Sequence, residues 1–138
     1  MAELTPKEIL TRYCKAMEIG ADECIALMHD DIVLYAPCVP APVPKTMTGL
    51  EAVGGAYKML FARLFKQFRW SGEIFATDNP EVAVARMSSR VELMDGRQYA
   101  NEYMLLSRVR DGKLCEHHEF FDSERATEAF GDLLSGRE

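Results

Sequence analysis

The sequence lacks any long hydrophobic run. No segment approaches the roughly 18 consecutive apolar residues that a membrane-spanning helix needs. Its first residues, MAELTPKEIL, contain no basic stretch followed by an apolar one, so we expect no secretion signal and a cytoplasmic location. Basic residues are scarce as well, with 16 Lys and Arg against 22 Asp and Glu and a formal net charge of −6. We therefore expect neither a membrane nor a nucleic acid as partner, because nucleic-acid binding normally needs a basic face.

The motifs of several common sites are also missing. The four cysteines are Cys14, Cys24, Cys38 and Cys115. They form no C-x-x-C pair and their spacing fits no zinc site, so we expect reduced thiols. His117, His118 and Glu119 are adjacent, but alternation along a strand places His118 on the opposite face and leaves too few ligands for closed zinc coordination. With no glycine-rich phosphate loop and no nucleophile elbow either, we expect no metal and no cofactor.

The sequence does have the composition of one folded domain spanning residues 1–138, with 48% apolar and 28% charged residues. Thr5, Pro6 and Glu8 form a capping box with proline at the first helical position, which predicts a helix over residues 5–19. Apolar spacing predicts further helices over residues 22–28, 49–65 and 123–134. Alternation and turn signals predict strands over residues 31–36, 67–76, 81–94, 97–110 and 113–121. Helices gathered on one side of an antiparallel sheet make an α+β fold.

Residues 37–49, PCVPAPVPKTMTG, hold four of the six prolines. Proline lacks a backbone donor and fixes its own backbone angle, so this segment is predicted to be a loop. It is too apolar for a free linker. We expect it to be packed, either beside a sheet edge or over a cavity.

Period-two alternation divides the last three predicted strands into two faces. One face mixes aromatic and charged side chains: Val84, Arg86, Ser88, Arg90, Tyr99, Asn101, Tyr103, Leu105, Cys115, His117, Glu119 and Phe121. The other face is more apolar. Two interpretations of the mixed face remain open on pattern alone. It is either exposed to solvent, as is usual in antiparallel sheets, or it lines a pocket in which a few polar groups converge among apolar ones.

Three segments carry a resemblance to a known family: ILTRYCKAM, IVLYAP with the proline-rich loop after it, and QYANEYMLLSRVRDGKLCEHHEFFD. They resemble the nuclear-transport-factor-2-like superfamily and, within it, the SnoaL-like and limonene-epoxide-hydrolase-like branch. The Asp-Gly-Lys turn followed by H-x-E-F-F-D is the most specific part, and the likeness covers nearly the whole chain. The resemblance implies a cone, in which a strongly curved antiparallel sheet wraps around N-terminal helices and encloses a pocket.

The resemblance also implies what each sheet face does. Polar side chains of the concave face would line the pocket, and the convex face would form a homodimer. The expected pocket residues are Arg86, Asn101, Tyr103, His117 and Glu119. The side chains expected to face the partner chain are Ala85, Met87, Val91, Met104 and Phe120.

The expected catalytic residues are Glu119, Arg86 and His117. Glu119 would be the general acid or base, Arg86 would hold a negative charge, and His117 would be a partner base. The residues expected to bind substrate are Tyr13, Ser88, Asn101, Tyr103 and Trp70.

The chain departs from its apparent relatives at two catalytic positions. Ser88 stands where epoxide hydrolysis would need a second carboxylate, and Ala36 stands where the ketosteroid-isomerase-like branch has an aspartate. The resemblance still implies cofactor-free acid–base chemistry on a small hydrophobic, oxygenated molecule, by isomerisation, cyclisation, dehydration or hydrolysis. The alternative is a non-catalytic module of the same fold that binds a ligand or dimerises.

Overall fold

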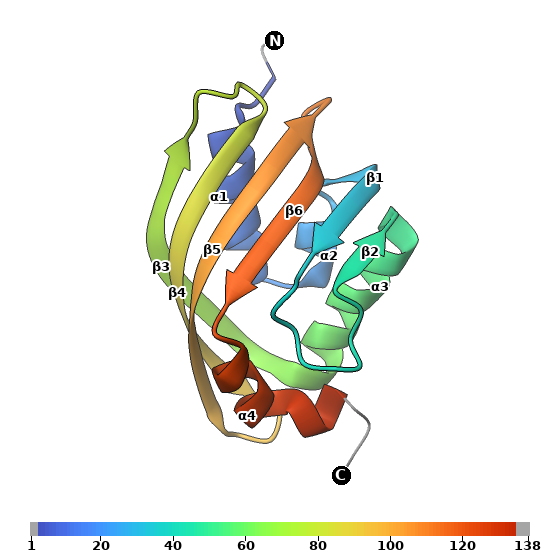
Figure 1. Cartoon of the computed structure of the whole chain (residues 1–138), viewed down its shortest axis with the longest axis vertical. Coiled ribbons are helices and arrows are strands. Elements are labelled where there is room, and N and C mark those ends of the chain that lie inside the picture. Colours follow the sequence, from blue (N-terminus) through green and yellow to red (C-terminus); the bar gives the residue numbers. More distant parts are fainter. Residues whose placement is uncertain (1–2, 135–138) are drawn as a thin grey trace.

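The computed structural model describes residues 3–134, which form a single curved sheet with helices packed on its concave side and across one end (Figure 1). The helices are α1 (Pro6–Met17), α2 (Ala21–Ile25), α3 (Leu50–Met59) and α4 (Ser123–Leu134). The strands are β1 (Met28–Tyr35), β2 (Thr46–Thr48), β3 (Phe65–Ala76), β4 (Val82–Leu93), β5 (Gln98–Arg110) and β6 (Lys113–Phe121). The predicted α+β cone is confirmed.

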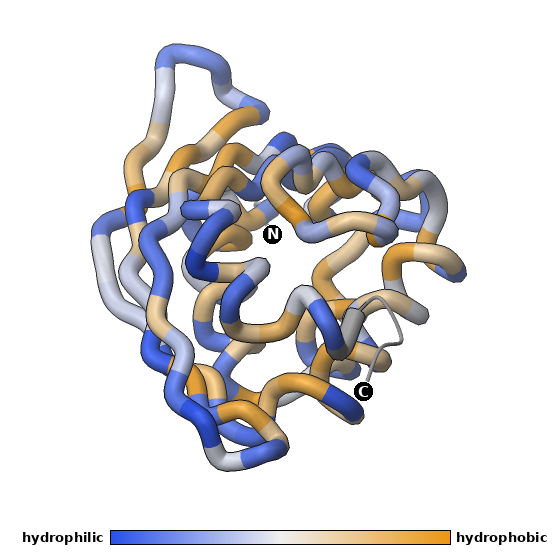
Figure 2. Tube along the Cα trace, turned by 60° about the horizontal axis from the view of Figure 1, so that its bottom comes forward, coloured by the Kyte–Doolittle hydropathy of each residue, from blue (hydrophilic) through white to orange (hydrophobic). Residues whose placement is uncertain are grey.

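The strands lie in the order β2-β1-β6-β5-β4-β3. β1 runs parallel to β6, and every other neighbouring pair is antiparallel. The short strand β2 falls in the segment predicted as a loop, and it pairs with β1 at the sheet edge. Figure 2 shows hydrophobic stretches on helices and strands alike, with hydrophilic stretches at the loop tips around the outside. None of the helices within residues 3–134 is both long and apolar enough to cross a membrane.

Helix α1 begins as its capping box predicts. The Thr5 hydroxyl accepts from the Glu8 backbone N–H at 3.1 Å, and the Glu8 carboxylate accepts from the Thr5 backbone N–H at 3.0 Å. The helix predicted over residues 49–65 is shorter than expected. Regular α-helix ends at Met59, and a π-helical turn, Leu60–Leu64, leads directly into β3.

Gly72 of β3 lies opposite Met87 of β4. A Cβ atom at this position would be 1.9 Å from the backbone carbonyl oxygen of Arg86. No side chain fits at that distance, so only glycine lets the two backbones approach this closely.

The prediction that Arg86 and Ser88 face the pocket is wrong, because the register of β4 and β5 places both on the convex face, where they are exposed. The cause is the length of the connecting loop. Leu93 pairs with Arg97 around a three-residue loop, whereas a two-residue Asp95-Gly96 loop would have shifted the pairing by one residue. A shift of one residue moves every side chain of a strand to the other face.

The register of β4 and β5 also shows that only some of the residues predicted to face a partner chain lie on the convex face. Ala85, Met87 and Val91 are buried in the core on the concave side. Met104 and Phe120 do lie on the convex face and are exposed. The convex face of β4 is therefore more polar than the alternation predicted, and its concave face is more apolar.

Candidate functional site

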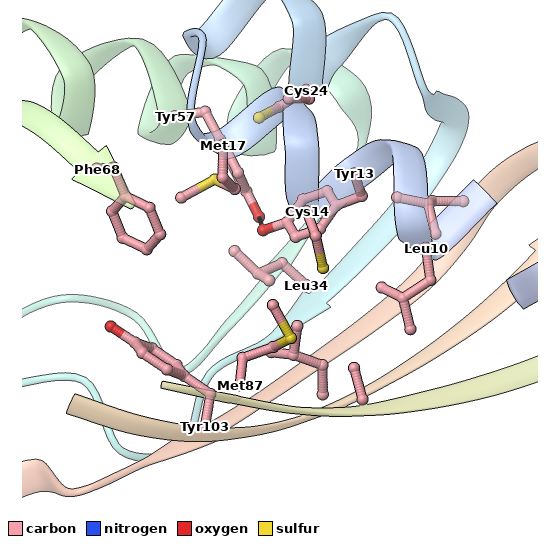
Figure 3. Packing of buried hydrophobic residues seen from close by; sticks show 14 of the residues in the cluster. Leu10, Tyr13, Cys14, Met17, Cys24, Leu34, Tyr57, Phe68, Met87 and Tyr103 are labelled. Carbon is pink, nitrogen blue, oxygen red and sulfur yellow. Dashed lines mark hydrogen bonds between the residues drawn. The ribbon is translucent and has the colours of Figure 1, made fainter. Parts of the chain in front are cut away.

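A cavity lies between the concave face of the sheet, α3 and the proline-rich loop. The cavity has a volume of about 110 Å³. Its walls are aliphatic and aromatic, and Glu119 is the one charged side chain among the described residues that line it. Figure 3 shows the Tyr13 and Tyr57 hydroxyls meeting above this space, with Tyr103 reaching up from the sheet. Val39, Val43 and Pro44 close one side, which confirms that the proline-rich loop is packed over a cavity.

The Glu119 carboxylate is held by two donors that converge on one oxygen. The Tyr13 hydroxyl donates to Oε1 at 3.0 Å, and His117 Nε2 lies 3.1 Å from the same atom. The Tyr13 and Tyr57 hydroxyls are 2.7 Å apart. Because the single proton of Tyr13 goes to the carboxylate, Tyr57 must be the donor in that pair. On the other side of the imidazole, Nδ1 lies 2.8 Å from the Ser107 hydroxyl oxygen.

These contacts keep Glu119 ionised at neutral pH. Burial acts to raise the pKa of the Glu119 carboxyl, but the hydrogen bond and charge of His117 and the hydrogen bond from Tyr13 outweigh it and leave this pKa below its ordinary value. Burial, together with the charge of Glu119, raises the pKa of Tyr13 and of Tyr57 well above the usual range. Both phenols therefore stay protonated and continue to act as donors.

The second carboxylate oxygen of Glu119 accepts no hydrogen bond from the described residues. Both protein donors use Oε1. In the described, non-exposed residues, every fully buried side-chain oxygen or nitrogen has a hydrogen-bond partner. Because Oε2 has none, it is not fully buried. The side chain is 20% exposed, and Glu119 is part of the cavity wall. An ionised carboxylate in the wall of an apolar cavity, with one oxygen anchored and the other free of donors from the described residues, is suited to act as a base.

The remaining predicted site residues occupy different places. Tyr103 and Trp70 line the cavity, and the Trp70 indole N–H donates at 2.7 Å to the carbonyl of Cys14, near the C-terminal end of α1. His117 is only 1% exposed and has both ring nitrogens occupied, so it positions Glu119 from behind the wall. Asn101 is buried behind the wall as well, where it binds the backbone of Asp122.

Sequence reasoning missed Tyr57 and Tyr99 as cavity residues. Tyr57 belongs to the apolar stripe of its helix, where a phenol has the same spacing as a purely structural aromatic residue. Tyr99 was on the mixed face of its strand, but nothing in the spacing distinguished it from Tyr103. A hydroxyl on an otherwise apolar stripe is the signal that could have marked Tyr57.

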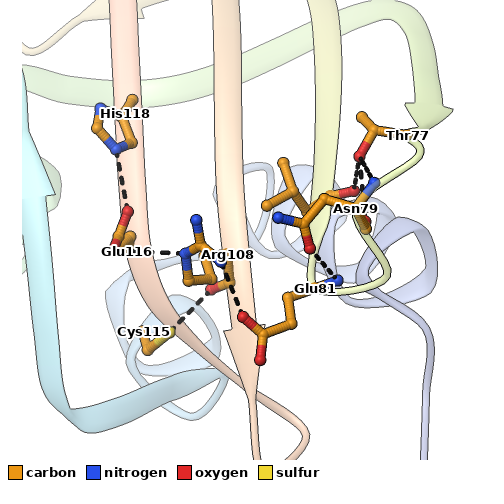
Figure 4. Close-up of polar contacts among 8 residues, drawn as sticks. Thr77, Asn79, Glu81, Arg108, Cys115, Glu116 and His118 are labelled. Atoms are coloured by element: carbon orange, nitrogen blue, oxygen red, sulfur yellow. Dashed lines mark hydrogen bonds and ion pairs between the residues drawn. The ribbon is translucent and has the colours of Figure 1, made fainter.

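A second polar cluster lies on the convex face, away from the cavity (Figure 4). Arg108 donates to Glu81 at 2.8 Å and lies 3.5 Å from Glu116, which in turn lies 3.4 Å from His118. The His118 ring also stacks on Tyr35, with centroids 4.3 Å apart. These contacts confirm that His118 and Glu119 point to opposite faces.

Comparison with known proteins identifies relatives of this chain. A family model of the SnoaL-like domain matches residues 10–117. The chain is 25% identical over 132 residues to an uncharacterised PhzA/B-like protein of Pseudomonas aeruginosa, covering 94% of this chain and 93% of that protein.

Two solved structures share the fold. A candidate isomerase from Bacillus subtilis superposes with a TM-score of 0.79 at 19% identity, covering 91% of this chain and 92% of that one. A Δ5-3-ketosteroid isomerase from Mycobacterium sp. gives a TM-score of 0.74 at 19% identity, covering 88% of this chain and 97% of that one. At these identities the likeness shows the fold alone.

Proposed function

Because the chain belongs to the SnoaL-like family of the nuclear-transport-factor-2-like superfamily, we propose that it is a cofactor-free enzyme that moves a proton on a small hydrophobic, oxygenated molecule. The observation that carries this proposal is the Glu119 carboxylate, which is ionised, lies in the wall of an apolar cavity and keeps Oε2 free of donors from the described residues. Glu119 would be the general base, while Tyr13 and His117 hold its other oxygen in place.

The cavity favours an uncharged substrate. The described lining residues include no lysine or arginine, so an anionic group would meet only the negative charge of Glu119. A carboxylate in a largely apolar site interacts strongly with the proton that it removes, because little water is present to screen it. The most suitable reaction is removal of a proton from a carbon next to a carbonyl, followed by its return elsewhere in the molecule. The isomerase names of two structural relatives support this class of reaction.

We also propose that the protein is a homodimer through the convex face of the sheet. That face exposes Phe75, Met104 and Phe120, and these residues are 44%, 49% and 46% accessible. Met104 and Phe120 are direct cross-strand neighbours, so their apolar surface is continuous. Burial of such surface is favourable by about 25 cal/mol per Å², and a second copy of the same face would provide it.

Deuterium exchange tests the catalytic proposal. The protein is incubated in D₂O with acetophenone and with 2-tetralone, and incorporation at the carbon next to the carbonyl is followed by NMR. We expect Glu119→Gln to slow the exchange by roughly 100-fold or more, the usual contribution of a positioned acid or base. Glu102→Gln, a carboxylate-to-amide change on the exposed face of β5, is the matched control and should exchange at the wild-type rate.

The same experiment distinguishes the alternative. A binding module of this fold would take up the ketones without accelerating exchange, and Glu119→Gln would make no difference to the rate. If both proteins bind ketone and the deuterium exchange rate is the same for the wild type and Glu119→Gln, the catalytic proposal is refuted. The protein would then be a ligand-binding module.

A further inference from the structure

Helix α4 contributes a side chain to the cavity that has no part in holding Glu119. Of the described side chains on α4, Phe130 is the one that lines the cavity, and it is 7% exposed. Its ring packs edge-to-face on Tyr99 of β5, with centroids 5.0 Å apart, and on Phe65 at the start of β3, with centroids 6.4 Å apart. Because α4 lies across one end of the sheet (Figure 1), Phe130 closes the cavity at that end.

Phe130 and Glu119 lie at opposite ends of the cavity. Glu119 of β6 is opposite Leu105 of β5. Tyr99, on which Phe130 packs, comes six residues before Leu105 on the same strand. A strand rises about 3.3 Å per residue, so these two positions are about 20 Å apart along β5. The cavity is therefore elongated, with the carboxylate near one end and the phenyl ring at the other.

A continuous line of aromatic rings joins the two ends. Ring centroids are 6.4 Å apart between Phe130 and Phe65, 5.3 Å between Phe65 and Phe68, and 5.0 Å between Phe68 and Trp70. All four side chains line the cavity. Trp70 then lies 6.3 Å from Tyr13, whose hydroxyl donates to the proposed base. Because the Trp70 indole N–H already donates to a backbone carbonyl, this wall offers a ligand carbon surface, which favours an apolar chain.

The position of Phe130 is fixed because α4 is tied to the sheet at two places. Immediately before the helix, the backbone of Asp122 is bound by both amide atoms of Asn101 on β5, at 2.9 and 3.1 Å. Further along the helix, the Arg97 guanidinium donates to the carbonyl of Ala129, the residue before Phe130. The phenyl ring is therefore a fixed boundary of the cavity.

We propose that Phe130 is a specificity-determining residue that limits how far a ligand can extend from Glu119. This inference rests on the proposed function, in which Glu119 removes a proton from the carbon next to a carbonyl group. The substrate class is an uncharged ketone with its carbonyl group near Glu119 and an apolar chain that follows the aromatic line toward Phe130. A chain longer than this distance has to displace the phenyl ring.

A series of straight-chain methyl ketones, from 2-hexanone to 2-tridecanone, tests this limit by calorimetric measurement of affinity. In the wild type, we expect affinity to rise roughly fourfold with each added methylene until the chain reaches Phe130, and then to level off. In Phe130→Ala, the ratio of the 2-tridecanone affinity to the 2-hexanone affinity should rise by roughly 15-fold, the effect of two further buried methylenes. Phe130→Leu, which keeps more of the packing, should give a smaller rise.

Phe61→Ala is the matched control. Phe61 packs on Phe65 with centroids 5.9 Å apart, as Phe130 does, but it is not part of the described cavity wall. Its removal should leave the ratio of the two affinities within about twofold of the wild-type value. A general loosening of the fold weakens short and long ketones together, so the ratio reports the length limit alone.

An unchanged ratio in both Phe130→Ala and Phe130→Leu would overturn the inference. A wild type that binds none of the ketones, or whose affinity keeps rising up to 2-tridecanone, would overturn it as well. Binding requires no proton transfer. A higher ratio in Phe130→Ala, in a protein that exchanges no deuterium, would therefore refute the catalytic proposal and leave the length limit intact. Deuterium exchange together with an unchanged ratio would refute the length limit alone.

Discussion

Replacing Tyr13 by phenylalanine removes one of the two donors that hold Glu119 and leaves the packing of the ring nearly unchanged. A hydrogen bond to a charged group contributes roughly 1.5–3 kcal/mol, and the substitution also removes the Tyr13 hydroxyl that accepts from Tyr57. We expect Tyr13→Phe to lower the free energy of unfolding by about 2 kcal/mol at pH 7.

This loss should depend on pH with a definite sign. The pKa of Glu119 is lower in the folded protein than its ordinary value of 4.5, so its ionised form stabilises the fold above the pKa of the unfolded chain. That contribution disappears as the pH falls through the folded pKa. The difference between the wild type and Tyr13→Phe should therefore be largest at neutral pH and shrink below the ordinary glutamate range.

Urea unfolding of a double-mutant cycle measures the interaction directly. The four proteins are the wild type, Tyr13→Phe, Glu119→Gln and the double variant, and we expect a coupling energy of about 1.5–2 kcal/mol at pH 7. Tyr35→Phe is the matched control. It removes a phenol hydroxyl but keeps the ring that stacks on His118, so its effect should stay within about 0.5 kcal/mol. A Tyr13→Phe loss that is equal at neutral and acid pH, and equal with Gln at position 119, would refute the account of the anchored carboxylate.

Two further predictions concern the sheet. Gly72→Ala should destabilise the protein by about 3 kcal/mol or more in urea unfolding, or prevent soluble expression, because the new Cβ atom would lie 1.9 Å from a backbone oxygen. If the variant is as stable as the wild type, the close approach of β3 and β4 is contradicted. Met104→Arg should convert the proposed dimer into a monomer in light scattering after gel filtration. Met94→Arg, an equally exposed methionine at the β4–β5 loop, should leave the mass of the assembly unchanged. A monomeric wild type, or a Met104→Arg dimer, would contradict the proposed interface.

The sequence predicted the order of the long elements and the α+β cone well. The capping box of α1 and the alternation of β5 and β6 are local signals that the tertiary structure did not override. The face of β4 was wrong for a different reason. Alternation sorts the residues of one strand, but the loop between strands sets the register, and the extra residue in the loop after Leu93 decided the position of Arg86.

The candidate site was predictable in part. Glu119 and His117 follow from the H-x-E spacing of a strand, which places both on one face. The partners of Glu119 could not be predicted in the same way. Tyr13 meets it across 106 residues of sequence, and Tyr57 meets Tyr13 across 44. Contacts of this kind depend on how the helices pack against the curved sheet. No local pattern in the sequence specifies that packing.

The most direct test of the account is the ionisation of Glu119 itself. In protein carrying ¹³C-labelled glutamate carboxyl groups, the Glu119 resonance is assigned by its loss in Glu119→Gln, and its chemical shift is followed with pH. The structure predicts a carboxylate at pH 7 whose pKa lies below the ordinary glutamate value, because Tyr13 and His117 donate to it. A resonance showing Glu119 protonated at pH 7 would contradict the claim that the cavity holds a ready base.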